Sequence, residues 1–170
     1  LIFMNQKKED GGVEFSAYVM IIATWPGDYN DDVDLYVRDP TGEVVFFRNK
    51  NNSLMHLDRD DLGTRGEYED TQGGTIPENR EIITIRQPVS GEFILNLHLY
   101  AKYSEDPLPV HVKVIRISPR YEIFDGVIIL DRVDEEKTIC RFDISDSGKI
   151  KDINFLPSNI ARNILRAAPQ

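Results

Sequence analysis

The sequence predicts an all-β fold: an antiparallel β-sandwich of jelly-roll or immunoglobulin-like type with a short C-terminal helix. Two observations predict it. About eight short runs alternate apolar and polar residues with the period of two expected of half-buried strands. Turn residues such as Pro88, Gly91 and Pro119 separate these runs, and neither an internal repeat nor a strand–helix–strand rhythm interrupts them.

The first expected strand spans residues 13–24, and a β-hairpin is expected to follow it. Residues 32–38 and 43–47 form its two arms, joined by the turn 39–42, in which Pro40 pre-sets φ and Gly42 allows a positive φ. Val33, Leu35 and Val37 fall on one face of the first arm. The other face carries Asp32, Asp34 and Tyr36, and we expect it to form an acidic rim in solvent.

Five later strands are expected, at residues 81–86, 91–100, 110–117, 121–130 and 137–144. Residues 49–80 read as one long irregular region. Ser158 is a plausible N-cap for the C-terminal helix, in which Ile160 and Ile164 recur at helical spacing. The inward-facing set is expected to include Phe15, Val19, Val33, Leu35, Phe93, Leu95, Leu97, Val112 and Val114.

Two acidic clusters suggest a metal site. The hairpin arm carries the first cluster, and the second follows in residues 58–61 of the irregular region. Calcium takes six to eight oxygen ligands, and alternating Asp-x-Asp geometry is one way to offer two of them. The interpretation as a solvated turn stays open, and so does pairing with Arg38 and Arg59. The candidate calcium ligands are Asp32, Asp34, Asp58, Asp60 and Asp61.

Composition and motifs argue against several functions. The chain has 170 residues and a formal net charge of −9, and its basic residues form no stripe, which argues against a nucleic-acid surface. The single Cys140 and the three dispersed histidines form no metal-binding spacing, and no nucleophile elbow or phosphate loop is present. His56 beside Asp58 is expected to be a solvated ion pair, and His98 and His111 to face outward. We therefore expect a protein without catalytic residues.

The beginning of the chain suggests a membrane attachment. Residues 1–4 are mostly apolar, and residues 6–12 are polar with two glycines. This boundary predicts the end of a membrane-spanning segment that runs into a linker; a short strand or a tail is the alternative. The expected organisation is residues 1–12 as segment end and linker, 13–156 as the sandwich, and 157–170 as a tail or short helix.

Five motifs stand out along the chain: ATW (23–25), DDVDLYVRDPTG (31–42), FRN (47–49), LMHLDRDDLG (54–63) and GEFILNLH (91–98). Together they resemble a family of uncharacterised bacterial membrane-anchored β-sandwich proteins found beside proton-channel proteins of the TolQ, ExbB and MotA kind. The resemblance covers most of the chain, although the insert 65–79 has no matched counterpart. The Asp-Val-Asp-Leu core is also similar, over a shorter stretch, to prepeptidase C-terminal-like extracellular domains.

The resemblance implies a single-pass inner-membrane protein with a periplasmic domain, acting as an accessory or structural partner of an ion-driven membrane complex. Two alternatives remain, because sandwiches serve many roles. One is a secreted or cell-surface module that binds carbohydrate or another ligand. The other is a structural protein of a phage particle or other large assembly, which would place the domain in a virion.

Overall fold

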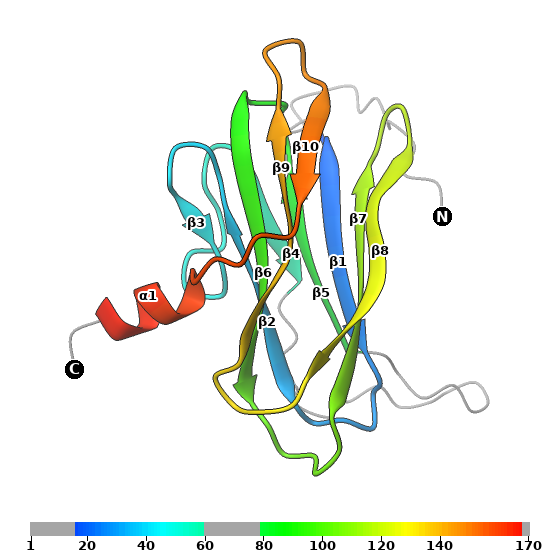
Figure 1. The fold of residues 1–170 in the computed structure, drawn as a ribbon, viewed down its shortest axis with the longest axis vertical. Coiled ribbons are helices and arrows are strands. Elements are labelled where there is room, and N and C mark those ends of the chain that lie inside the picture. The colour runs from blue at the N-terminus through cyan, green and yellow to red at the C-terminus, as the bar shows by residue number, and fades with distance from the viewer. Residues whose placement is uncertain (1–15, 60–78, 168–170) are drawn as a thin grey trace, which may run out of the picture.

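The computed structural model describes residues 16–59 and 79–167. In this part, two five-stranded antiparallel sheets pack face to face, and one short helix lies near the C-terminus (Figure 1). The all-β sandwich with a C-terminal helix is therefore confirmed.

Each sheet draws its strands from distant parts of the chain. Sheet A has the order β4 (Met55–Arg59), β5 (Asn79–Ile85), β1 (Val19–Trp25), β7 (Leu108–Arg116) and β8 (Tyr121–Leu130). Sheet B has the order β10 (Ile150–Asn154), β9 (Glu136–Ile144), β6 (Gly91–Ala101), β2 (Asp32–Arg38) and β3 (Val44–Val45). Helix α1 spans Ala161–Ala167.

The main core lies between the sheets, and alternation along the strands builds it. In β1 every second residue is buried, and in β2 the buried side chains of Val33, Leu35 and Val37 all join this core. The expected inward set is confirmed wherever the structure describes it, and Phe15 lies outside the described residues. Its fully buried members are Val19, Val33, Leu35, Phe93, Leu95, Leu97, Val112 and Val114.

Two strands were not predicted. Strand β4 lies in the region expected to be irregular, where it pairs with β5 and buries Met55 and Leu57 in the core. Its five residues follow a stretch rich in asparagine, so their alternation is too short to read from the sequence. Strand β10 pairs with β9 through an irregular register, and its Asp152 has a φ of 54°.

The outer face of sheet B is covered, contrary to the expectation of an exposed acidic rim. Asp34 is only 3% exposed, and Tyr36 is fully buried in a second apolar cluster with Phe46 and Ile94. Ile160 and Ala161, at the start of α1, complete that cluster, and Figure 1 shows the helix beside β2 and β3. The prediction for this face was wrong because a segment more than a hundred residues later in the chain covers it.

The helix is held by a carboxylate from another strand, not by the predicted cap Ser158. Glu136 of β9 accepts hydrogen bonds from the backbone N–H groups of Ile160, Ala161 and Arg162, at 2.5, 3.1 and 3.2 Å. A carboxylate satisfies amides that a helix start leaves without partners. Within residues 16–59 and 79–167, no helix is both long and apolar enough to cross a membrane.

Candidate functional site

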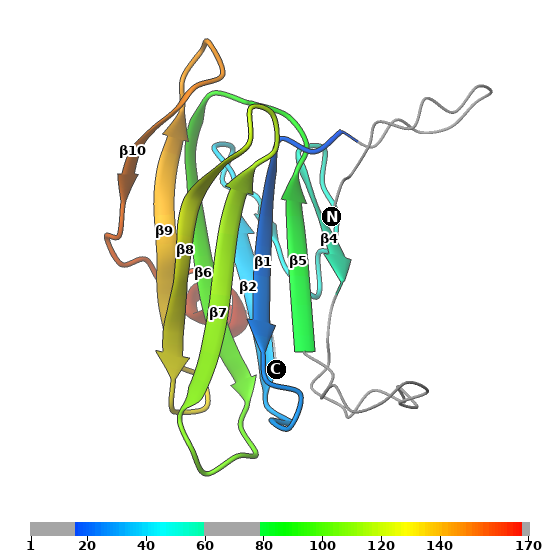
Figure 2. The same ribbon diagram turned by 90° about the vertical axis from the view of Figure 1, so that its right-hand side faces the viewer.

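Three loops meet at one end of the sandwich. They are the β1–β2 loop (26–31), the β6–β7 loop (102–107) and the β8–β9 loop (131–135), and Figure 2 shows them at the end opposite to the start of the described chain. In folds of this kind, loops on a rigid scaffold commonly carry binding residues. This end is therefore the first candidate for a functional site.

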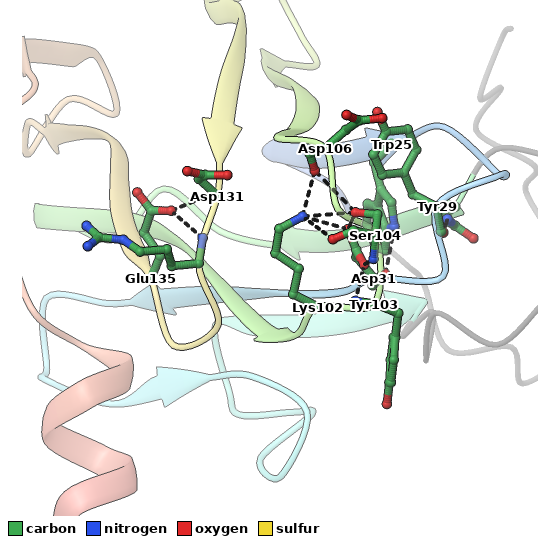
Figure 3. Close-up of polar contacts among 11 residues, drawn as sticks. Trp25, Tyr29, Asp31, Lys102, Tyr103, Ser104, Asp106, Asp131 and Glu135 are labelled. Atoms are coloured by element: carbon green, nitrogen blue, oxygen red, sulfur yellow. Dashed lines mark hydrogen bonds and ion pairs between the residues drawn. The ribbon is translucent and has the colours of Figure 1, made fainter.

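Asp31 ties the first two loops together. Its carboxylate is fully buried and accepts hydrogen bonds from the backbone N–H of Tyr103 at 2.5 Å and of Ser104 at 2.8 Å. The Ser104 hydroxyl donates to the second carboxylate oxygen, and Lys102 Nζ lies 3.6 Å from that oxygen (Figure 3). Burial would raise the pKa of Asp31, but the Ser104 and Tyr103 hydrogen bonds and the Lys102 charge outweigh it and hold the pKa below its ordinary value.

The rest of the loop end is equally well bonded. Lys102 Nζ donates to the backbone carbonyl oxygens of Ser104 and Asp106, at 2.9 and 2.6 Å. In the third loop, Glu135 accepts from the backbone N–H of Asp131 and of Arg132, and these bonds outweigh burial and lower its pKa. The loops are thus preorganised by their own polar groups.

Trp25 is the last residue of β1, just before the first of these loops. Its side chain is buried, and its indole N–H donates to the backbone carbonyl of Asp31 at 3.0 Å. The loops expose two large apolar side chains among charged ones such as Glu105 and Arg132: Tyr103 is 74% exposed and Val133 is 61% exposed. Asp31 already accepts three hydrogen bonds, so it organises the loops and is poorly suited to act as a catalytic base.

The candidate calcium ligands lie in different parts of the fold. Asp32 and Asp34 belong to β2 in sheet B, whereas Asp58 belongs to β4 in sheet A. The neighbours of Asp34 and Asp58 along each strand face the core, so these two side chains leave opposite faces of the sandwich. Asp60 and Asp61 lie outside the described residues. Among the residues that the structure does describe, no three His, Cys, Asp or Glu side chains are grouped to hold a metal ion. The calcium site stays a prediction.

His56 and Asp58 are in contact through His56 Nε2 and an Asp58 carboxylate oxygen, but within a strand. Both belong to β4, not to a loop, and Asp58 also accepts a hydrogen bond from the Thr84 hydroxyl at 2.5 Å. Arg86 Nε donates to His56 Nδ1 at 2.8 Å. These contacts connect β4 to β5 and to the residue that follows β5. The His56–Asp58 contact therefore has a structural role, which is to hold β4 in the sheet.

Polar groups are also buried on the outer face of sheet B, near α1. His98 faces outward from β6 as expected, yet it is buried, and its Nε2 lies 2.8 Å from Asp134 Oδ1. Asn96 donates to Glu136 Oε1 and to the backbone carbonyl of Ser158. Burial, and then the Asp34 carboxylate, raise the pKa of Tyr36, so its phenol stays neutral. This cluster anchors the C-terminal segment.

Two hollows open on the surface. The larger, of about 720 Å³, lies between the β3 hairpin and α1, but the Asn52 amide that lines it is committed to Asp39, Glu43 and its own loop. The smaller, of about 390 Å³, lies on the outer face of sheet A and is mostly apolar. Its walls are Thr24, Trp25, Pro26, Gly27, Asp28, Pro109, His111 and Val127.

Exposed apolar side chains gather on the edge strands β8 and β10 and on the residues just after β10. They are 44–63% exposed. Phe124 of β8 and Phe155 beyond β10 are in ring contact, with centroids 6.1 Å apart, so the two edges adjoin. The sequence signal, visible in retrospect, is the adjacent apolar pairs 128–129 and 155–156, which break the alternation. We call this set the apolar side: Val127 and Ile129 on the outer face of sheet A, and Ile153, Phe155 and Leu156 on and just after β10.

Comparisons of this chain with protein-family models, with curated proteins and with solved structures find no match.

Proposed function

We propose that this chain is a non-enzymatic interaction domain that binds a partner protein through its apolar side. The observation that carries the proposal is the exposure of five large apolar side chains over two adjoining sheet edges. Water disfavours exposed apolar surface, and large apolar side chains that gather in exposed positions commonly mark protein–protein contacts. The loop end, with its preorganised backbone and exposed Tyr103, is a second surface that the same partner could reach.

The resemblance extends the proposal to a setting. We propose that the domain lies in the periplasm, anchored through an upstream helix, and that its partner belongs to an ion-driven complex of the TolQ, ExbB or MotA kind.

Copurification of the full-length protein tests the proposal. In the triple variant Ile153→Ser, Phe155→Ser and Leu156→Ser, the side chains are largely exposed and only the ring contact of Phe155 with Phe124 is lost, so folding stability should fall by no more than about 1–2 kcal/mol. We expect the wild type to copurify from detergent-solubilised membranes with a TolQ- or MotA-type subunit, and the triple variant to lose it. A matched triple variant on the opposite edge, Thr41→Ser, Arg48→Ser and Asn49→Ser, should retain it.

Two results would contradict the proposal. One is a full-length protein that copurifies with no such subunit. The other is equal copurification by both triple variants. Retention of the domain on a polysaccharide column would instead favour the carbohydrate-binding alternative.

A further inference from the structure

Among the strands that the structure describes, four lie at sheet edges, and β8 is the longest of them. It has ten residues, whereas β4 and β10 have five each and β3 has two. An edge strand presents backbone N–H and C=O groups that another strand can pair with, and natural proteins usually keep such edges short or irregular. β10 follows this rule through its irregular register and the left-handed Asp152. β8 also has one register shift against β7, at Ile123, but it pairs with β7 without interruption over residues 124–130.

The outward-facing backbone groups of β8 can be assigned from its partners. Ile129 lies opposite Pro109 of β7, and proline has no N–H to donate. The carbonyl oxygen of Ile129 instead accepts a hydrogen bond from Lys137 Nζ at 2.6 Å. The backbone of Ile129 therefore faces away from β7, and alternation along an antiparallel strand turns the N–H and C=O of Val127 and Asp125 the same way.

The side chains beside this edge suit an added strand. Val127 is 60% exposed and Ile129 is 45% exposed, on the outer face of sheet A. Val127 is also in the wall of the 390 Å³ hollow, together with Pro26 and Pro109. When a peptide adds to a sheet, backbone pairing supplies affinity, and pockets for alternate side chains supply specificity. The edge of β8 offers backbone groups for pairing, and the mostly apolar hollow beside it offers a pocket for one side chain.

We propose that β8 is a strand-addition site: an extended segment of a partner protein pairs with β8 and places one apolar side chain over Val127 into the hollow. This inference rests on the proposed interaction function and names its mode. The Ile129 carbonyl already accepts from Lys137, so the groups left for a partner are the Ile129 N–H and the N–H and C=O of Val127 and Asp125. They select an extended polypeptide, since neither a sugar nor a lipid offers a ladder of N–H and C=O groups. A second copy of this chain is the poorer occupant, because each copy carries a net charge of −9.

The probe for the test is a phage-displayed library of random dodecapeptides, panned against the purified 170-residue chain. Enriched peptides are synthesised, and their affinity is measured by fluorescence anisotropy. We expect sequences with alternating apolar residues. We also expect binding to slow hydrogen exchange at the amides of Val127 and Ile129, which pairing would protect.

Two substitutions at Val127 test whether the peptides bind at the β8 edge and not elsewhere on the surface. Val127→Pro removes an outward N–H without removing a bond to β7, so the variant should fold and bind the peptides at least about tenfold more weakly. Val127→Ser keeps the N–H and should weaken binding less, because it removes only the apolar contact. The control is Val133→Ser in the β8–β9 loop; Val133 is 61% exposed, close to the 60% of Val127, and this variant should bind as the wild type does.

The proposal is overturned if no enriched peptide binds, or if exchange protection maps to another edge or to the loop end. It is also overturned if Val127→Ser and Val133→Ser bind equally, a comparison that holds even if Val127→Pro fails to fold. The proposed function has its own readout: if the serine triple variant on the β10 side loses copurification while Val127→Ser retains it, the interaction function stands and strand addition at β8 fails.

Discussion

Replacing Asp31 should destabilise the domain strongly, although the residue lies in a loop. Its buried carboxylate accepts from two backbone N–H groups and one hydroxyl, and it lies near the Lys102 ammonium. Asp31→Ala leaves the two N–H groups without their acceptor, at about 1–3 kcal/mol each, and leaves Lys102 without its counter-charge. We expect a total loss of about 3–5 kcal/mol in the free energy of unfolding.

Asp31→Asn should lower the free energy of unfolding by less than Asp31→Ala does. Its loss relative to the wild type measures the contribution of the negative charge. An amide oxygen in the place of Oδ1 still accepts from Tyr103 and Ser104, and the Ser104 hydroxyl can turn to accept from the new amide group. Only the charge-assisted part is lost, so we expect a cost of about 1–2 kcal/mol.

Urea denaturation followed by tryptophan fluorescence measures both values, because Trp25 donates to the backbone of Asp31. Asp106→Ala is the control in the same loop: its side chain is exposed, and only its backbone carbonyl is used, so stability should stay within about 0.5 kcal/mol. The reasoning is refuted if Asp31→Asn costs as much as Asp31→Ala, or if neither variant differs from the control.

The stabilisation by Asp31 should also depend on pH. Its pKa is lower in the folded protein than in an unfolded chain. The contribution is therefore present above the unfolded pKa and is lost as the pH falls through the folded pKa. The gap in unfolding free energy between wild type and Asp31→Asn should be largest near neutral pH and shrink in acid; a constant gap down to pH 2 would contradict this assignment.

Four further outcomes are expected. Leu95→Ala should lower the free energy of unfolding by about 2–5 kcal/mol in urea titrations, because the side chain is fully buried, and a loss below about 1 kcal/mol would contradict its core position. Burial raises the pKa of Cys140 to about 12, so Ellman's reagent at pH 8 should react with the unfolded chain but not with the native one. Glu136→Gln should speed amide exchange at Ile160 and Ala161, whose N–H groups it holds, while exchange in β6 stays slow; unchanged exchange would show that apolar packing alone holds α1. If the acidic clusters bind calcium, millimolar Ca²⁺ should raise the melting temperature and Asp34→Asn should abolish the rise. No shift and no heat in isothermal titration would leave a purely structural loop.

The sequence predicted the strands that have a full alternating run of apolar and polar residues. It did not predict which outer sheet faces are covered by another segment. The alternation in residues 91–100 predicts β6 and its inward set, because burial on one face imposes the period of two along the strand. The outer face of the hairpin arm gave the opposite result. Asp34 and Tyr36 read as solvent-facing, but both are buried, and residues at the start of a helix from the other end of the chain pack in one cluster with Tyr36. Local pattern carries no information on which distant segment returns to a face.

The polar organisation of the fold was equally hidden from the sequence. Asp31 and Ser104 are 73 residues apart, and Glu136 caps amides up to 26 residues later. A carboxylate read from sequence alone is as easily a metal ligand as an acceptor for distant amides, and the two roles share the same residue type. The sequence pattern therefore singled out the neighbouring Asp32 and Asp34 but did not predict that Asp31 holds two loops together.

Site-specific photo-crosslinking in the full-length, membrane-embedded protein tests the central claim, that the apolar side binds a partner protein, most directly. Benzoylphenylalanine is placed at Leu156, on the apolar side, or at Thr41, an exposed turn residue at the opposite edge. The account predicts that irradiation at position 156 joins the chain to a TolQ-, ExbB- or MotA-type subunit, identified by mass spectrometry, and that position 41 gives no such product. Crosslinks to that subunit from position 41 but not from position 156, or from neither, would contradict it.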